Sequence, residues 1–310
     1  MKAARITADG LYRAALGGAV ALVFVVVALI VFEAARGAGL SIRTFGLGFL
    51  TSTAWDPVSE KFGALPYIYG TVVSSALALL LAVPLGIGSA VYLAEIAPRR
   101  VGAIVSFVIE LLAAIPSIVY GVWGFFVLAP WLRTAIEPWL IAHVGFLPLF
   151  RGYPFGIGML NAAIVLSIMV VPTIVSISRE VLLSTPRSLR EAALALGATP
   201  AEAIGVALDA ARPGILGAVI LALGRALGET MAVTMVIGNT NRISASLLDP
   251  AATMASIIAN EFTEATTPLY ISSLIEIALV LFAITIVVNG AARVLVYWAT
   301  GGRRSTAALA

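Results

Sequence analysis

Six long apolar runs constrain this chain more than any other feature of its sequence. Each is long enough to cross a hydrocarbon core about 30 Å thick as a helix with a rise of about 1.5 Å per residue. The runs cover residues 14–32, 65–93, 101–128, 155–177, 213–237 and 270–298. They predict an all-α integral membrane protein with six transmembrane helices, in which residues 1–310 form a single transmembrane domain.

The composition excludes a soluble globular protein. Hydrophobic residues make up 61% of the chain and charged residues 11%, whereas soluble domains are about half apolar and a quarter charged. The absence of cysteine excludes disulfides and thiolate metal sites. A net charge of +3 is too small and too dispersed to indicate nucleic-acid binding. We expect a lipid bilayer as the main partner, with no nucleic acid, no metal site and no cofactor bound by this chain.

The first apolar run and residues 130–154 can each be interpreted in two ways. The first run follows Lys2, Arg5 and Arg13 as a signal peptide would, but five further runs favour an uncleaved helix. Residues 130–154 carry Trp131, Trp139 and the single histidine, His143. This content predicts a helix at the membrane surface, with His143 as a surface or packing residue rather than a pH sensor.

The distribution of basic residues predicts the orientation. Twelve of them lie on one side of the membrane: Lys2, Arg5, Arg13, Arg99, Arg100, Arg179, Arg187, Arg190, Arg212, Arg293, Arg303 and Arg304. Six lie on the other: Arg36, Arg43, Lys61, Arg133, Arg151 and Arg242. Because basic residues are enriched on the cytoplasmic side, both termini and the loop at 185–212 are expected in the cytoplasm of a multi-pass inner-membrane protein.

The loop at 185–212 contains signals for two short helices around a bend. Pro186 suits a first helical position and Gly197 suits a C-terminal cap. Thr199, Pro200 and Glu202 then form the pattern of a capping box that begins a second short helix. From spacing alone, this segment could equally be an ordinary connection between membrane helices.

Arg225 and Glu229 are charged residues far from either end of the fifth run. Arg225 lies 12 residues, or roughly 18 Å, beyond Pro213, which places it near mid-depth. Glu229 is one helical turn further, so the two side chains can pair. Small residues at Gly217, Gly224, Gly228 and Ala232 predict that another helix approaches closely. Two other carboxylates within runs, Glu110 and Glu276, are expected to have structural roles.

The loop also carries a family resemblance. Glu191, Ala192, Ala193 and, after three residues, Gly197 resemble the EAA loop of ABC importer permeases, which in that family docks into a groove on the ATPase subunit. The family pattern ends in Leu-Pro, whereas this chain has Leu208-Asp209. The departure leaves the end of the second short helix undetermined.

Four longer segments are similar to the PstC permeases of bacterial phosphate importers, and the resemblance covers roughly residues 45–298. The segments are 62–75, 94–100, 109–124 and 223–239. The resemblance implies a type I ABC importer permease fold and transport of inorganic phosphate by alternating access. It also implies three kinds of partner: a PstA-like second permease, an ATPase homodimer and an extracytoplasmic phosphate-binding protein.

The chain lacks a glycine-rich phosphate loop followed by Lys-Ser or Lys-Thr, so ATP and Mg²⁺ are expected on the partner ATPase and this chain is a transport subunit, not an enzyme. Under the resemblance, Arg225 is expected to line the phosphate path and Glu229 to tune it; a purely structural ion pair is the alternative. A permease for molybdate or sulfate, and a secondary transporter, are the alternative functions.

Overall fold

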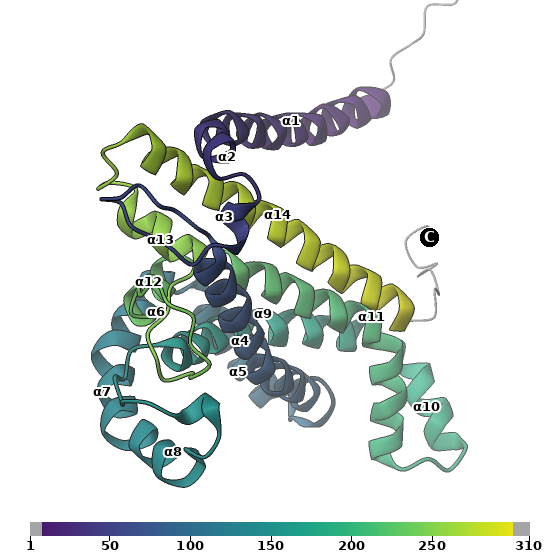
Figure 1. Ribbon diagram of the computed structural model, residues 1–310. Coiled ribbons are helices and arrows are strands. Elements are labelled where there is room, and N and C mark those ends of the chain that lie inside the picture. Colours follow the sequence, from purple (N-terminus) through teal and green to yellow (C-terminus); the bar gives the residue numbers. More distant parts are fainter. Residues whose placement is uncertain (1–7, 300–310) are drawn as a thin grey trace, which may run out of the picture.

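The computed structural model describes residues 8–299 and consists of helices joined by short connections (Figure 1). Lys2, Arg5, Arg303 and Arg304, which contribute to the expected orientation, lie outside the described residues. Within 8–299 the only β pairing is two isolated bridges. The α-helices are α1 (Ala8–Gly37), α2 (Gly39–Phe45), α3 (Gly48–Thr51), α4 (Leu65–Val91), α5 (Arg99–Ala114), α6 (Ser117–Trp123), α7 (Ala129–Trp131), α8 (Glu137–Val144), α9 (Met159–Ser184), α10 (Arg187–Ala195), α11 (Pro200–Leu227), α12 (Met231–Val236), α13 (Met254–Glu261) and α14 (Pro268–Ala299).

Six stretches of the described chain are long and apolar enough to cross a membrane, which confirms the expected number of spans. They are Tyr12–Gly37, Leu65–Ile96, Ser117–Val144, Met159–Ser184, Pro200–Leu227 and Pro268–Trp298. The second stretch extends to Ile96 because the π-helical turn η1 (Tyr92–Ile96) continues α4. The third is continuous because the π-helical turns η2 (Gly124–Leu128) and η3 (Leu132–Ile136) join its α-helical segments.

The predicted bounds of the third span are wrong. Instead of one helix over 101–128, α5 ends at Ala114 and a new helix begins after Pro116 and continues to Val144. The ring of Pro116 disfavours the helical conformation of Ile115, which is extended at φ −65° and ψ 129°. The predicted surface helix over 130–154 is therefore also wrong, because its first part continues the long helix and its second part is a loop containing the 3₁₀ turn η4 (Pro148–Phe150).

The predicted start and end of the fifth span are wrong as well. α11 begins at Pro200, passes through Pro213 without a break and ends at Leu227, after which α12 starts at Met231. A proline inside a helix removes one backbone hydrogen bond, and here the neighbouring turns maintain the helix. The second short helix of the 185–212 loop and the fifth span are therefore one element.

The helices α4 and α9 form the centre of the bundle, and α9 is the most buried of the six membrane-length stretches (Figure 1). They pack closely at Gly86, where an added Cβ atom would lie 2.7 Å from Ile174 Cγ2. Two turns further along α9, Gly214 of α11 lies against Val181, with only 2.6 Å from an added Cβ to Val181 Cγ1. These contacts fix α11, and with it the 185–199 segment, to the core.

The helix α1 extends away from the bundle and is exposed along nearly its whole length (Figure 1). Its C-terminal end is attached to α14 at Gly37, where an added Cβ atom would lie 2.9 Å from Ile275 Cδ1. Serine hydrogen bonds strengthen this junction, because Ser272 Oγ accepts from Ser41 N at 3.0 Å and donates to Gly37 O at 2.7 Å. Glu276 is buried beside Ser41, with 6% of its surface exposed.

The opposite end of the bundle from α10 is closed by loops that fold onto the helices. The segment after α12 turns at Gly238 and Asn239, both with positive φ, and returns so that Met254 N donates to Thr71 Oγ1 at 2.9 Å. Glu137, which is 1% exposed, accepts a hydrogen bond from Gly156 N at 2.9 Å and anchors the loop before α9. No sequence pattern predicts this buried carboxylate, because its partner is the backbone amide of Gly156.

Candidate functional site

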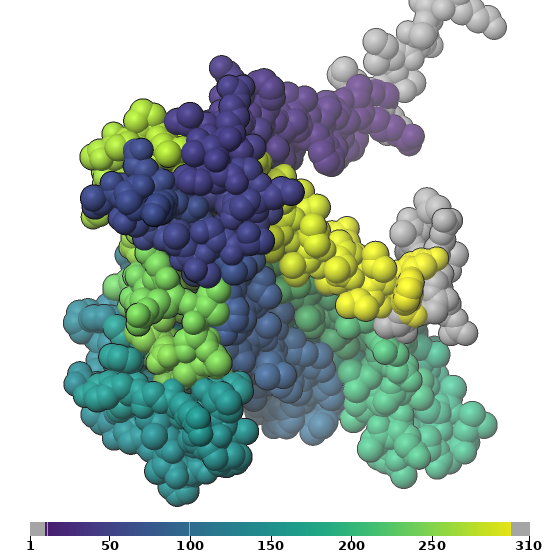
Figure 2. All heavy atoms as spheres, viewed as in Figure 1, coloured from purple at the N-terminus to yellow at the C-terminus, as the bar shows by residue number. Residues whose placement is uncertain are grey.

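The hairpin formed by α10 and the start of α11 projects from the body of the molecule (Figure 1) and forms a separate lobe (Figure 2). Its bend is a complete Schellman turn: Ala198 N donates to Ala193 O at 3.1 Å and Gly197 N to Leu194 O at 3.0 Å. Gly197 has φ +87°, a conformation that side chains with a Cβ atom disfavour. The expected glycine bend is therefore present at Gly197.

The predicted capping box after the bend is also confirmed. Thr199 N donates to Glu202 Oε2 at 2.7 Å, and Glu202 N donates to Thr199 Oγ1 at 3.4 Å. These two bonds satisfy amides that the first turn of α11 would otherwise leave free. The bend and the cap together fix the angle between α10 and α11.

The four residues of the EAA pattern lie on an open surface of this hairpin. Glu191, Ala192 and Gly197 are exposed and Ala193 is partly buried. No heavy atom lies within 4 Å of a Cβ atom built on Gly197. Beside them Leu189, Leu194 and Leu196 are 39%, 47% and 90% exposed. The hairpin thus presents apolar side chains, a carboxylate and free space around its bend, a combination typical of a surface that another protein covers.

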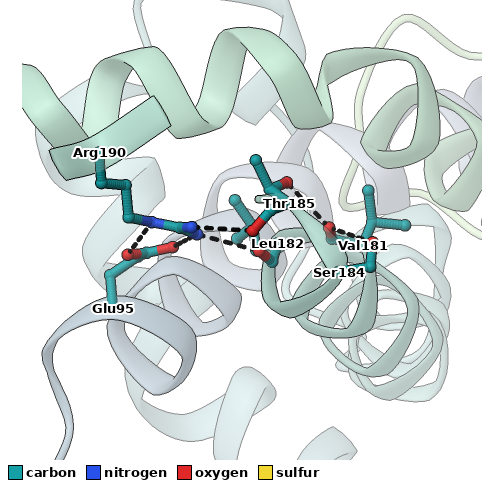
Figure 3. A network of polar contacts seen from close by, with 6 residues as sticks. All are labelled: Glu95, Val181, Leu182, Ser184, Thr185 and Arg190. Carbon is teal, nitrogen blue, oxygen red and sulfur yellow. Dashed lines mark hydrogen bonds and ion pairs between the residues drawn. The ribbon is translucent and has the colours of Figure 1, made fainter. Parts of the chain in front are cut away.

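A buried ion pair attaches the hairpin to the membrane helices (Figure 3). The guanidinium of Arg190 on α10 donates two hydrogen bonds to the carboxylate of Glu95 in η1: from Nε at 2.9 Å to Oε2, and from Nη2 to Oε1. It also donates from Nη1 to Thr185 O and from Nη2 to Leu182 O, both at 3.0 Å. The side chains of Arg190 and Glu95 are only 18% and 8% exposed.

This network connects three elements through one side chain. Arg190 belongs to α10, Glu95 to the turn after α4, and the two carbonyls to the end of α9. A bidentate guanidinium has little freedom to rotate, so the hairpin cannot shift without moving these ends. The sequence does not predict this pair, because the two residues are 95 positions apart.

The predicted pairing of Arg225 with Glu229 is not found. Within residues 8–299 no ion pair joins the two side chains. The helix α11 ends at Leu227, so Glu229 is not one turn further along it, and its carboxylate instead accepts a hydrogen bond from Ala232 N at 3.3 Å. Glu229 thereby caps the start of α12.

Arg225 is partly buried, and its charge acts electrostatically on the hydroxyl of Tyr120. Tyr120 in turn donates to Leu112 O at 2.8 Å. Beside Arg225, Gly224 lies near Asn289 of α14, at 3.8 Å from an added Cβ atom to Oδ1. Arg225 therefore lies between the α6 and α14 sides of the bundle.

The predicted stripe of small residues is only partly used within this chain. Ala232 contacts Gly121, where an added Cβ atom would lie 2.9 Å from Ala232 Cα, and Gly224 approaches α14. Gly217 has open space around it, and Gly228 has only Gly224 O within range. The close helix contact on α11 is made instead by Gly214, about one turn before Gly217.

Comparisons with known proteins agree on one family. Residues 82–298 match the family described as "Binding-protein-dependent transport system inner membrane component". The chain is 49% identical over 290 residues to a "Phosphate transport system permease protein PstC" of Mesorhizobium japonicum, covering 92% of this chain and 89% of the relative. It is 46% identical over 293 residues to a protein of the same name from Xylella fastidiosa, covering 93% and 90%.

A structural comparison gives the same fold. A chain of the MetNI methionine ABC transporter in an inward-facing conformation aligns with a TM-score of 0.54, covering 74% of this chain and 93% of that chain. The sequence identity is 19%, so this likeness bears on the arrangement of the helices alone.

Proposed function

We propose, from the premise that the chain belongs to the binding-protein-dependent transport system inner membrane component family and within it to the PstC permeases, that it carries inorganic phosphate across the inner membrane. It has the type I ABC importer permease fold and is a multi-pass membrane protein. The 49% identity over 92% of the chain to a phosphate transport system permease carries the proposal.

As a permease, the chain acts as a transport subunit. It works with a PstA-like second permease, an ATPase homodimer that binds ATP and Mg²⁺, and an extracytoplasmic phosphate-binding protein. The exposed EAA surface of α10 supports the ATPase contact, because Leu196 and its apolar neighbours Leu189 and Leu194 are exposed. Glu191, Ala192, Ala193 and Gly197 form the docking surface. With the ATPase bound there, the α10 end of the bundle and both termini are expected in the cytoplasm.

The transmission of movement follows from the Arg190 network. When ATP draws the ATPase subunits together, α10 moves with them. Arg190 passes this displacement to Glu95 after α4 and to the carbonyls at the end of α9. The helices α4 and α9 are the two at the centre of the bundle, so the movement reaches its core. Opening of the phosphate path is thereby coupled to ATP binding at a surface outside the membrane.

Arg225 lines the phosphate path and Glu229 tunes it. A guanidinium can hold an oxyanion by two parallel hydrogen bonds, and no carboxylate pairs with Arg225 among the described residues. Because Glu229 caps α12, it tunes the site by fixing the break between α11 and α12, immediately after Arg225.

Reconstitution of the complete importer in proteoliposomes tests the function. Radiolabelled phosphate should accumulate only when ATP, the ATPase and the binding protein are all present. Excess molybdate or sulfate should not compete. Competition by either oxyanion at the concentration of phosphate would change the cargo assignment, and accumulation without the ATPase would indicate a secondary transporter.

A further inference from the structure

A polar cavity lies between α5 and α9, on the side of the bundle that carries α10. It has a volume of about 310 Å³ and is lined from α5 by Ser106, Ile109 and Glu110, and from α9 by Val175, Ser176, Arg179, Glu180 and Leu183. At about 30 Å³ per water molecule, this space holds roughly ten waters, or a small oxyanion with part of its hydration shell.

Two hydrogen-bond donors in this cavity are buried without a partner. Arg179 Nε and Ser106 Oγ are both inaccessible to solvent and make no hydrogen bond in the structure. A buried unpaired donor costs free energy, about 1–3 kcal/mol for a neutral group and more for a charged one, so such groups normally have a ligand or water. Arg179 and Ser106 both line the cavity, so a change of rotamer at each side chain brings these donors to an anion that enters from the open side.

The mouth of the cavity is acidic. Glu110 and Glu180 are exposed at its rim, whereas Arg179 is partly buried. Val175 lies nine residues before the end of α9, so the cavity reaches roughly 14 Å into the bundle from that end. Carboxylates at such positions do not face lipid, so this surface borders water or another subunit.

The charges suit transient binding. Within the described chain no ion pair joins Arg179 to Glu110 or Glu180, so the guanidinium is available to an oxyanion. The two carboxylates lower the affinity and prevent the anion from being trapped, which a transport site requires.

Tyr120 links the region of Arg225 to α5. The charge of Arg225 acts electrostatically on Tyr120, and the Tyr120 hydroxyl donates to Leu112 O, two residues after Glu110 on α5. We propose that the α5–α9 cavity is a second, low-affinity oxyanion-binding position, with Arg179 and Ser106 as donors, that phosphate occupies after Arg225 on its way to the cytoplasm. This inference rests on the proposed function.

The absence of cysteine from the chain allows a direct test of binding. Ser176→Cys places one thiol in the cavity, and inorganic phosphate should slow its reaction with a methanethiosulfonate reagent in the assembled importer without ATP. In the Arg179→Gln background, the phosphate concentration needed for half-protection should rise by about tenfold or more, because a charge-assisted hydrogen bond is lost. Ser184→Cys, exposed at the end of α9 and outside the cavity, should show no protection.

Transport gives the second readout. Arg179→Gln should lower phosphate uptake about tenfold while the complex assembles and hydrolyses ATP, and Arg179→Lys should restore part of the uptake. The matched control is Arg100→Gln, which removes the same charge from an exposed position at the start of α5.

The outcomes separate this inference from the proposed function. Phosphate uptake by the unmodified importer without protection of Ser176→Cys would overturn the inference and leave the function intact. If phosphate protects Ser176→Cys but the unmodified importer takes up no phosphate, the binding site would be supported and the proposed transport function would be overturned. Protection by phosphatidylglycerol vesicles but not by inorganic phosphate would identify a lipid headgroup as the ligand and overturn the transit role.

Discussion

At the scale of single residues, the Arg190–Glu95 pair is the part of the structure with the clearest energetic consequence. Glu95→Leu removes both acceptors from a guanidinium that is only 18% exposed, which should cost about 3 kcal/mol. We expect a lower midpoint in thermal unfolding of the purified complex and fewer phosphate ions transported per ATP hydrolysed. Arg187→Gln, on an exposed position of the same helix, should change neither quantity.

Exchanging the two charges gives a sharper version of this test. Glu95→Arg with Arg190→Glu recreates opposite charges, but a glutamate at 190 cannot donate to Leu182 O and Thr185 O. The double variant should therefore recover less than half of the lost coupling. Full recovery would mean that the ion pair alone matters and that the contacts with the end of α9 contribute nothing.

Arg225 is the second residue with a specific expectation. Arg225→Gln should reduce phosphate uptake at least about a hundredfold, because it removes a bidentate, charge-assisted contact with the anion. The complex should still assemble, since no protein carboxylate within residues 8–299 depends on this guanidinium. An uptake assay checks the loss of transport, and copurification with the ATPase checks that the complex assembles. Loss of assembly would indicate a structural role for Arg225 instead.

Glu229 should respond differently to two substitutions. Glu229→Gln keeps a side-chain oxygen that can accept from Ala232 N, so the cap of α12 survives, whereas Glu229→Leu removes it. We expect the glutamine variant to retain most of its phosphate uptake. The leucine variant should lose more uptake, because removal of the cap destabilises α12 by about 1 kcal/mol. Equal effects of both substitutions on uptake would show that the negative charge, and not the cap, is what the path requires.

At the scale of elements, the prolines show where sequence reasoning reached its limit. Pro116 divides a predicted helix, whereas Pro213 lies inside a continuous one. Both residues remove the same backbone donor, so the local cost is similar. The outcome depends on the contacts of the flanking turns: Gly214, next to Pro213, packs tightly on Val181. Such contacts are tertiary and cannot be read from the sequence around a proline.

The bend of the α10 hairpin could be predicted because its determinants are local. Gly197 at C′ and the Thr199–Glu202 box are short-range signals, and both are present in the structure. The Arg225–Glu229 pair could not be judged in the same way, because helical spacing applies only while the helix continues. The break after Leu227 removed the basis of that prediction.

The bend can be separated from docking by two substitutions at Gly197. No atom of this chain lies within 4 Å of its added Cβ, so Gly197→Asn, which tolerates positive φ, should leave the hairpin and ATPase binding nearly unchanged. Gly197→Trp should block the docking surface and uncouple ATP hydrolysis from uptake or prevent assembly. Normal transport by the tryptophan variant would remove the main support for docking at this bend.

At the scale of the whole molecule, the two ends of the bundle have different characters. The α10 end carries an exposed hairpin tied to α4 and α9 through Arg190, whereas the other end is closed by loops that pack on the helices. The number of spans was predictable from the length of the apolar runs. The positions of α5 and α1 depend on contacts that those runs do not specify.

The orientation of these two ends is the last prediction. We expect the α10 end in the cytoplasm, because the sequence assigns twelve basic residues to that side and six to the other. The chain has no cysteine, so single thiols at Ser188 in α10 and at Val58, which is 94% exposed before α4, report unambiguously. In cells lacking the ATPase, an impermeant thiol reagent should label Val58→Cys in spheroplasts and Ser188→Cys only after permeabilisation. Labelling of Ser188→Cys in intact spheroplasts would show that the orientation is the opposite of the predicted one. A cytoplasmic ATPase could not then reach Glu191.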